Sequence, residues 1–470
     1  MQTGENIVNN LLKDLSVDNR LWQITLAGTM SLATAITWYF LKHPVIPFII
    51  GAAPLAIYFV LKKPFWICLF FILFSFFRLH EAFPVLMPFR IPQLIAIAAL
   101  STLGWHIFIS NSIKYFISEE HKWFLVYFLI VTVGLVFAEY REGAIASWTG
   151  NYVKVAVMVF AISWLIQEKK DFGLAMRLIV ICGIAIAIVA LNNHANGIGL
   201  VEGTRVTIGR DIDSVLGDPN DLALVLLFPV SFALSMAFTK GVGGISRLLG
   251  FIGFILIVSG IIATQSRGGL LGITAIVGVF AFRKIPSKTV VLILGGLLLI
   301  FLVSIAGISD RSSGGASEEG IDESAMGRIH AWETAWNMAV SNPLTGVGLR
   351  NYTENYYAYT EFWDGKNHAV HSTWFEVLAE TGFVGFITFL ILFAVVLKSA
   401  LRSVNRLDEL RTSGSDVSSE FYASAQGVLL GLFSFMVSGT FLTQAFTWPF
   451  YILLALTVAI KYQFRIDDAT

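Results

Sequence analysis

The sequence predicts an all-α, polytopic integral membrane protein with about 12–14 transmembrane helices and one large extramembrane loop that contains short helices. The chain of 470 residues is 56% hydrophobic and only 14% charged, whereas soluble domains carry roughly 25% charged residues. Its mean hydropathy is +0.72. Apolar runs of about 20 residues, enough to cross a hydrocarbon core of roughly 30 Å, recur along the chain. A soluble protein could not cover its surface with so few charges.

The remaining composition excludes several classes of function. The formal net charge is zero, so there is no electrostatic footprint for nucleic acid and no such partner is expected. Cys68 and Cys182 both fall inside apolar runs, which predicts small core residues rather than a disulfide or a metal pair. The chain is polar up to about Arg20 and the first apolar run begins near Leu21, so no cleavable signal peptide is expected.

Fourteen apolar runs predict the membrane-spanning helices. The third and tenth runs are short, and fusing or splitting the first four would change the number to twelve or thirteen. The predicted spans are 22–40, 45–61, 65–79, 91–109, 123–140, 151–167, 174–192, 221–239, 248–264, 268–282, 288–307, 375–397, 424–441 and 445–460.

Lysine and arginine residues fall unevenly between the two sets of loops. The set richer in both, together with the two termini, is predicted to be cytoplasmic. Most basic residues of the opposite, outer loops are Arg, which binds phosphate and carboxylate through a planar fork that Lys lacks. Anchoring at helix ends is an equal alternative for Arg78, Arg90 and Arg141. The predicted organisation is N-terminal membrane helices over 1–192, an outer loop over 193–220, membrane helices over 221–307, a large outer loop over 308–374, and C-terminal membrane helices with a cytoplasmic tail over 375–470.

The large outer loop opens with a Gly-, Ser- and acid-rich run from Ser312 to Glu323, which predicts a flexible segment. A helical pattern follows over 326–341 and ends before Pro343. Its apolar stripe is expected to pack down on the membrane domain, and consists of Ile329, Trp332, Trp336 and Ala339. The aromatic stretch over 352–363 is typical of an interfacial belt, with sugar stacking as the less favoured alternative.

Two arginines predicted to lie on the outer side of the membrane are adjacent to glycines in the sequence. Arg267 lies at the outer end of a predicted span and is followed by Gly268 and Gly269. A charge at the lip of the bilayer is functional by default, and glycine lets backbone and ligand approach closely; a snorkelling anchor is the alternative. Arg328 follows a glycine in the large loop. The turn over 343–352 contains a Gly-x-Gly run, but it lacks the strand-then-helix setting of a nucleotide loop.

His371 lies where the large loop re-enters the membrane. If it opens the next helix, the positive end of the helix dipole disfavours its protonation, and a neutral imidazole can accept a proton. A hydrogen-bonded interfacial histidine is the alternative. Glu380 is nine residues further on, on roughly the opposite helix face, so the two are not paired as an acid–base dyad. A buried carboxylate there needs a partner, which we expect to be an outer arginine.

An acidic segment precedes the helix predicted over 221–239. Asp211 and Asp213 form an Asp-x-Asp pair, which can hold a divalent metal on a diphosphate, although the spacing is common and metal binding is not the favoured interpretation. Asp218, followed by Pro219 and Asn220, predicts a helix N-cap with proline in the first turn. No His/Cys cluster in the sequence predicts zinc.

Together these blocks resemble the O-antigen ligase and O-antigen polymerase superfamily, and most of all its ligases. The resemblance covers roughly 200–400, and the Gly217–Asn220 turn resembles the start of the shared domain. It depends on the order of several motifs, with a large external loop between the second and the last: Ser266-Arg267-Gly268-Gly269, Gly327-Arg328 with Trp332, Pro343 to Asn351, His371-Ser372, and Glu380-Thr381-Gly382.

The resemblance implies a GT-C-like membrane glycosyltransferase that uses a lipid-linked donor. It would transfer a glycan from undecaprenyl diphosphate to a hydroxyl of lipid A–core, on the periplasmic side of a bacterial inner membrane. It would invert the anomeric carbon and use no metal or other cofactor. By position, Arg267 and Arg328 match arginines thought to hold the diphosphate, and His371 matches a histidine thought to activate the acceptor. Arginines expected to bind diphosphate or glycan besides these are Arg205, Arg210 and Arg350; residues expected to support the site are Asp218, Asn220 and Glu380.

Three other functions stay open at this stage. An O-antigen polymerase would use the same chemistry to extend the glycan on its lipid carrier. A protein O-oligosaccharyltransferase would use a protein hydroxyl as acceptor. A transporter of lipid-linked glycans is a different class, but the arginines gather on one face and no internal repeat is visible, which disfavours a pathway across the membrane.

Overall fold

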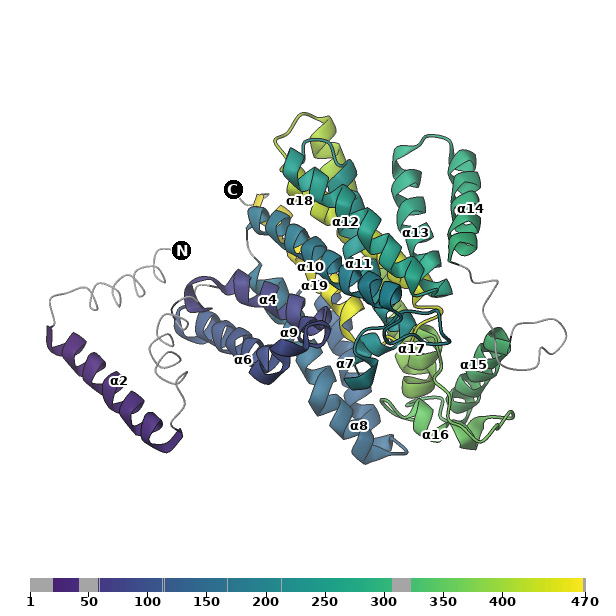
Figure 1. The fold of residues 1–470 in the computed structure, drawn as a ribbon, viewed down its shortest axis with the longest axis horizontal. Coiled ribbons are helices and arrows are strands. Elements are labelled where there is room, and N and C mark those ends of the chain that lie inside the picture. Colours follow the sequence, from purple (N-terminus) through teal and green to yellow (C-terminus); the bar gives the residue numbers. More distant parts are fainter. Residues whose placement is uncertain are drawn as a thin grey trace. The chain divides into compact units, whose positions relative to one another are not determined.

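The structure, a computed structural model, describes residues 20–41, 58, 60–111, 113, 115–166, 168–212, 214–306 and 323–467. Every named element in these ranges is helical (Figure 1), and the pairing between Val201 and Arg205 is an isolated bridge. The predicted all-α class is therefore confirmed. Most of the second predicted span, the run over 312–322, Asp213 and the chain termini lie outside the described residues.

The chain divides into two compact units. The first comprises Met1–Phe71, Pro92–Phe116 and Trp164–Ile166. It contains α2 (Arg20–Leu41), the first part of α4 (Pro64–Phe76) and almost all of α6 (Ile91–Gly104), which continues as the π-helical turn η2 (Trp105–Ile109). Within this unit the ring atom Nε2 of His106 lies 2.7 Å from the carbonyl oxygen of Leu61.

The second unit comprises Ile72–Ile91, Ile117–Ser163 and Gln167–Thr470 and carries the predicted site residues. Its helices are α5 (Leu79–Ala82), η1 (Pro84–Phe89), α7 (Glu119–Phe137), α8 (Arg141–Ser147), η3 (Trp148–Tyr152), most of α9 (Val153–Leu165), α10 (Lys169–Asn196), η4 (Arg210–Ile212), η5 (Val215–Gly217), α11 (Pro219–Phe238), α12 (Gly244–Ala263), α13 (Arg267–Lys284), α14 (Lys288–Ile305), α15 (Glu323–Ser341), α16 (Tyr352–Tyr359), α17 (Thr373–Thr412), α18 (Ser419–Ser438) and α19 (Trp448–Asp467).

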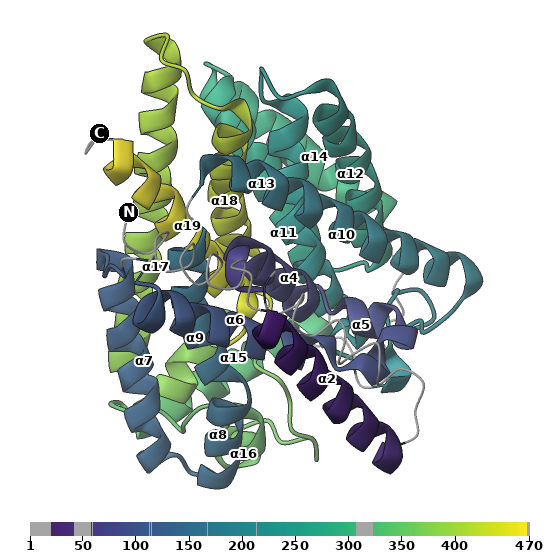
Figure 2. The same cartoon turned by 90° about the vertical axis from the view of Figure 1, so that its left-hand side faces the viewer.

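Helix α11 lies at the centre of this unit, where α10, α12, α13 and α18 pack around it (Figure 2). Nearly all of its residues are buried, as expected for a helix that is apolar on every face. Asp218 caps its first turn by accepting hydrogen bonds from the backbone N–H groups of Asn220 and Asp221. The predicted N-cap at Asp218 is therefore confirmed, and it fixes where α11 begins.

Nine helices in the described part of the chain are long and apolar enough to cross a membrane, and Pro64–Phe76 and Trp448–Phe464 are shorter apolar helices. The polytopic class is thus confirmed, and the total of about 12–14 spans stays a prediction. Helix α17 is much longer than its predicted span over 375–397, because it continues from Thr373 to Thr412.

Helix α17 is interrupted at Gly382, whose backbone angles are φ 65° and ψ −171°. The turn that follows Pro343 inserts at this break. The N–H of Phe383 donates to the carbonyl of Pro343 at 2.9 Å, and the N–H of Val347 donates to the carbonyl of Ala379 at 2.9 Å. These bonds satisfy backbone groups that a broken helix would otherwise leave unpaired inside a membrane. The Gly-x-Gly turn and the Thr381-Gly382 pair therefore form one structural joint.

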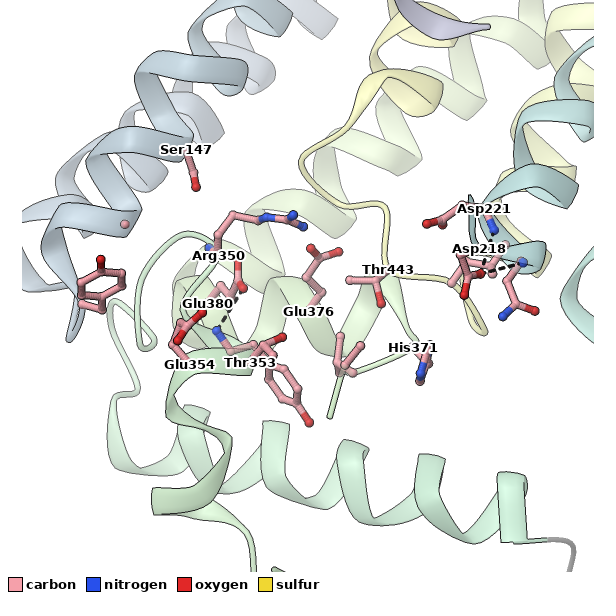
Figure 3. A pocket seen from close by; sticks show the side chains of 17 residues that line it. Ser147, Asp218, Asp221, Arg350, Thr353, Glu354, His371, Glu376, Glu380 and Thr443 are labelled. Carbon is pink, nitrogen blue, oxygen red and sulfur yellow. Dashed lines mark hydrogen bonds between the residues drawn. The ribbon is translucent and has the colours of Figure 1, made fainter. Parts of the chain in front are cut away.

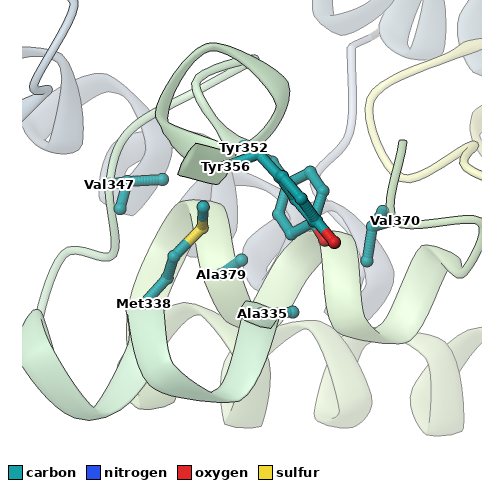
Figure 4. Packing of buried hydrophobic residues seen from close by; sticks show 7 residues of the cluster. All are labelled: Ala335, Met338, Val347, Tyr352, Tyr356, Val370 and Ala379. Atoms are coloured by element: carbon teal, nitrogen blue, oxygen red, sulfur yellow. The ribbon is translucent and has the colours of Figure 1, made fainter. Parts of the chain in front are cut away.

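The loop helices α15 and α16 pack on the first part of α17 around a small core (Figure 4). The predicted stripe is only partly right. Ala339 is buried and Trp332 is half-buried against this core, but Ile329 and Trp336 are 46% and 50% exposed. Helix α15 is rotated about its axis relative to the predicted orientation, because small side chains let it approach α17 closely. The core residues are Ala335, Met338, Val347, Tyr352, Tyr356, Val370 and Ala379.

Candidate functional site

A cavity of about 560 Å³ lies in the second unit, between α8, the start of α11, α16, the start of α17 and the segment between α18 and α19. Figure 3 shows polar side chains from these elements turned toward one space. Predicted site residues among its lining are Asp218, Asn220, Arg350, His371 and Glu380. Further lining residues include Tyr140, Ser147, Asp221, Thr353, Glu354, Glu376, Leu442 and Thr443.

His371 stands directly before the N-cap of α17. The Ser372 hydroxyl accepts from the N–H of Phe375, which makes Ser372 the cap, and His371 has a left-handed backbone with φ 48°. Its side chain is half-buried. Burial, and next the positive charge of Arg328, lower the pKa of His371 below the ordinary value of 6.5, while Asp218 acts in the opposite direction. His371 is therefore a neutral imidazole near pH 7, able to accept a proton.

The segment between α18 and α19 holds one wall of the cavity. Thr373 donates from its N–H to the carbonyl of Gly439 and from its hydroxyl to the carbonyl of Leu442, both at 2.7 Å. The N–H of Ala445 donates to the carboxylate of Glu376 at 2.8 Å. These bonds fix Thr443, whose buried hydroxyl oxygen has no hydrogen-bond partner among the residues that the structure describes.

Arg205 does not line the cavity but contacts a residue that does. It is buried, with 7% exposure, and its guanidinium donates to the side-chain oxygen of Asn220 at 2.9 Å and to the carbonyl of Thr264 at 3.2 Å. Asn220 in turn lines the cavity beside Asp218. The structure therefore brings Arg205, Asn220 and Asp218 together, as the sequence predicted that they would share a site.

Arg267 and Arg328 approach the same segment from two helices. Arg328, on α15, lies over the ring of Phe441 with 5.7 Å between the guanidinium carbon and the ring centroid. Arg267 is the first residue of α13, and a Cβ on the adjacent Gly268 would lie 3.2 Å from Cβ of Phe441. Helix α13 therefore begins beside the residue over which Arg328 lies. Neither arginine is part of the cavity lining.

The glycine after this position serves helix packing. A Cβ at Gly269 would lie 2.9 Å from side-chain carbons of Ala223 and Ile261. The N–H of Gly269 donates to the Ser266 hydroxyl, which caps α13. Gly269 therefore allows the close contact of α13 with α11 and α12, and its expected role in close ligand approach stays a prediction.

Glu380 is held by backbone donors. Its carboxylate accepts from the N–H of Arg350 at 2.6 Å and from the N–H of Tyr352 at 3.2 Å. The expected partner, an outer arginine, is therefore Arg350, but through its main chain. The Arg350 side chain extends into the cavity toward Glu376 (Figure 3), and its charge acts on both carboxylates.

Arg210 and Asp211 lie apart from the cavity lining. Both are exposed, and Arg210 donates to the carbonyl of Gly217 at 3.4 Å. Asp213, the other half of the predicted Asp-x-Asp pair, is outside the described residues. Among the residues that are described, no group of three or more His, Cys, Asp or Glu side chains could hold a metal ion.

The charge of the cavity differs from that of its neighbourhood. Five carboxyl groups line it, from Asp218, Asp221, Glu354, Glu376 and Glu380, beside the guanidinium of Arg350 and the imidazole of His371. Of the other predicted arginines, Arg205 donates to Asn220 and Arg328 lies over Phe441. His371 lines the cavity, and the charges of both Arg328 and Asp218 act on it.

Sequence reasoning assigned no role to Glu376, Asp221 or Thr443. A usable signal existed for Glu376, because it stands four residues before Glu380 and two carboxylates at that spacing share one face of an apolar helix. Asp221 accepts from the side-chain amide of Gln444 at 2.6 Å, and this contact joins residues far apart in the sequence. Thr443 stands in a short connection that carries no motif.

Comparison with known protein families matches residues 252–390 to the family described as O-antigen ligase. This match confirms the resemblance predicted from the sequence and supports membership of the O-antigen ligase superfamily. It includes Arg267, Arg328, Arg350, His371 and Glu380. Arg205, Asp218 and Asn220 precede the matched residues. No curated protein matches the chain.

Proposed function

We propose that this member of the O-antigen ligase superfamily is itself a ligase, which transfers a glycan from undecaprenyl diphosphate to a hydroxyl of lipid A–core. The family match supports a glycosyltransferase of the ligase or polymerase type in a membrane. The observation that carries the proposal is the position of His371, a neutral imidazole between an acidic cavity and a group of arginines. We place this site on the periplasmic face of the inner membrane.

In the proposed reaction His371 acts as general base. As the acceptor hydroxyl oxygen forms a bond to the anomeric carbon, its proton moves to the imidazole. The bond between that carbon and the phosphate oxygen breaks, and the electron pair leaves with the lipid diphosphate. A single displacement inverts the anomeric carbon. General-base catalysis of this kind contributes roughly 10²–10⁴-fold in rate.

The diphosphate is assigned to the arginine region. The cavity is the less favourable place for it, because its lining carries one guanidinium beside five carboxyl groups. Arg328 of α15 lies over Phe441. Helix α13 begins at Arg267 beside the same residue, and its N-terminus adds a positive dipole end. Preorganised charges of this kind stabilise the negative charge that grows on a leaving diphosphate.

The acceptor sugar is assigned to the acidic cavity. Carboxylates accept hydrogen bonds from sugar hydroxyls, and the unpartnered Thr443 hydroxyl can donate or accept a further one. A volume of about 560 Å³ lies within the range of about 300–1,000 Å³ typical of small-molecule sites. His371 lines this cavity and can therefore reach the hydroxyl that reacts.

The first test is a gel of lipopolysaccharide from cells that lack the gene, beside the complemented strain. A ligase predicts core without glycan, while polymer accumulates on the lipid carrier. A single repeat on the core would indicate a polymerase instead. An unchanged ladder would contradict both and favour a protein acceptor or transport.

The second test separates catalysis from binding in purified protein. His371→Ala is expected to abolish transfer and leave donor binding unchanged. Thr443→Val is expected to raise KM for the acceptor about tenfold, because it removes one hydrogen bond to a buried polar group. Its KM for the donor should stay unchanged. Normal transfer by the His371→Ala protein would overturn the mechanism. A covalent glycosyl-enzyme would do the same.

A further inference from the structure

A second cluster of charged side chains lies at the opposite end of the same helices. Helix α11 starts at the cavity and ends at Phe238, about 30 Å away at a rise of 1.5 Å per residue. Around that end stand Arg247 of α12, Arg283 and Lys284 of α13, and Arg411 of α17. None of these residues was assigned a role in transfer.

These side chains form one connected group. Arg283 pairs with Asp408 at 2.7 Å, and the Tyr422 hydroxyl donates to the same carboxylate at 2.5 Å. Arg411 lies over the Tyr422 ring, 4.5 Å from its centroid, and Lys284 approaches the Tyr422 hydroxyl at 3.3 Å.

The group continues onto the turn after α11. Arg411 donates to the carbonyl of Lys240 at 2.8 Å, and Arg247 donates to the carbonyl of Thr239 at 3.3 Å. The nearby Glu420 is paired with Arg177 and accepts from the Ser246 hydroxyl. The group therefore contains four basic side chains, from Arg247, Arg283, Lys284 and Arg411, and Arg283 pairs directly with Asp408.

Three N–H groups in this cluster are buried without a hydrogen bond to any described residue: Nε of Arg247, Nε of Arg283 and Nη1 of Arg411. A buried charged donor without a hydrogen-bond partner is unfavourable, and an acceptor placed beside it would stabilise it. Guanidinium groups arranged in this way match the oxygens of a phosphate, which can accept from several forks at once. The cluster thus has both the charge and the spare donors for an anion.

Exposed apolar side chains adjoin the cluster. Phe282 directly precedes Arg283 and is 49% exposed, and Phe238 directly precedes Thr239 and is 51% exposed. Ile245 and Leu248, on either side of Arg247 on α12, are 89% and 59% exposed. A ligand with a phosphate head and acyl chains would meet donors at the helix ends and apolar surface along α11, α12 and α13.

We propose that the cluster of Arg247, Arg283, Lys284, Arg411 and Tyr422 binds the phosphate of an anionic phospholipid in the membrane leaflet opposite the glycosyl-transfer site. The guanidinium groups hold the phosphate oxygens, and the acyl chains lie against the exposed side chains of α11, α12 and α13. Basic pockets between membrane helices recognise anionic lipid head groups in this manner. The site is independent of the transfer reaction.

The test measures lipid binding to the purified full-length protein in non-ionic detergent by native mass spectrometry. Phosphatidylglycerol is titrated against phosphatidylcholine, with inorganic phosphate in a separate titration. Arg283→Gln and Arg411→Gln are expected to weaken phosphatidylglycerol binding roughly tenfold or more, because each removes a charge-assisted hydrogen bond. The matched control is Arg406→Gln, which removes the same charge from an exposed residue of α17 paired with Glu409.

Asp408→Asn tests the site without removing a lipid ligand. It neutralises the carboxylate that competes for Arg283, so binding of phosphatidylglycerol should tighten, whereas a purely structural ion pair predicts no gain. Equal binding by Arg411→Gln and Arg406→Gln would overturn the proposal. Saturation by inorganic phosphate as tight as by the lipid would overturn the lipid as occupant and indicate a soluble anion.

Discussion

At the scale of single residues, the backbone of His371 is strained, and neighbouring hydrogen bonds hold it in this conformation. Its left-handed backbone, with φ 48°, is uncommon for a residue other than glycine and costs of order 1–3 kcal/mol. The hydrogen bonds of Ser372 and Thr373 on either side of the α17 start hold it there. Strain of this kind persists where the surrounding structure fixes it, and here it directs the imidazole to the cavity.

The pH dependence of transfer follows from the pKa of His371. Burial and Arg328 lower that pKa below 6.5, so the base is mainly neutral at neutral pH and is lost as the pH falls through its pKa. The acidic limb of the kcat/KM profile, which reports the free enzyme, should therefore have its midpoint below 6.5. In Arg328→Gln the midpoint should move upward, since one cation that opposes protonation is removed. An identical limb in His371→Ala would assign the titration to another group.

The arginines should differ in their effect on catalysis. Arg328 lies over Phe441 beside the start of α13, whereas Arg210 is exposed and bonded to a loop carbonyl. Arg328→Gln should lower kcat/KM for the lipid donor by about 10²–10³-fold, the effect of removing one preorganised donor to a developing negative charge. Arg210→Gln should change it by less than about threefold, within the small range of exposed charges. Comparable losses in the two variants would place the diphosphate elsewhere.

At the scale of the helices, the interruption of α17 determines the geometry of the site. The first part of α17 presents Glu376 and Glu380 to the cavity, and the break at Gly382 receives the turn from Pro343. Glu380 then binds the N–H groups at the start of α16. One joint thereby connects the outer loop to the membrane helix that carries the cavity carboxylates.

Gly382→Ala should disrupt this joint. Its φ and ψ lie in a region essentially restricted to glycine, and a Cβ would lie 2.6 Å from the carbonyl oxygen of Pro343. A loss of about 2 kcal/mol or more in the free energy of unfolding is expected, measured as thermal stability in detergent. Gly278→Ala on α13, where a Cβ would have nothing within 4 Å, should be neutral or stabilising. Equal stability of both variants would refute the role given to the break.

Helix positions were predictable, and the joint was not. Each predicted span that lies in the described residues corresponds to a helix, because an apolar run must satisfy its own backbone hydrogen bonds in lipid. The break at Gly382 depends on a turn some 40 residues earlier, and no local pattern reveals it. The orientation of α15 was missed for a related reason: Ala331, Ala335 and Ala339 bury better than Trp336 where the helix approaches α17.

Some residues of the candidate site were likewise predictable from the sequence, and others were not. Arg267 stood out as a charge at the lip of the bilayer, and the roles of Arg267, Arg328 and His371 were predicted from the family resemblance; of the three, His371 lines the cavity. The wall formed by Leu442 and Thr443 carries no charge, and its importance comes from hydrogen bonds that Thr373 and Glu376 make to it across about 70 residues. Contacts of that range are set by tertiary packing.

At the scale of the whole second unit, polar groups of two kinds occupy the two ends of one set of helices. The cavity end has its carboxylates, His371 and the nearby arginines, and the other end has the basic cluster around Asp408. Excess Lys and Arg mark the cytoplasmic side of membrane proteins. The cavity should accordingly open to the periplasm and the cluster should face the cytoplasm.

Cysteine labelling in intact cells tests this orientation. Cys68 and Cys182 are 0% and 9% exposed, so the native chain gives little background with a membrane-impermeant maleimide. Thr353→Cys, at an exposed position that lines the cavity, should be labelled from outside the inner membrane once the outer membrane is made permeable. Arg406→Cys, exposed near the far end of α17, should react only after the inner membrane is lysed. The reverse pattern would put the cavity in the cytoplasm, where no periplasmic ligase could use it, and would move the proposed lipid site to the outer leaflet.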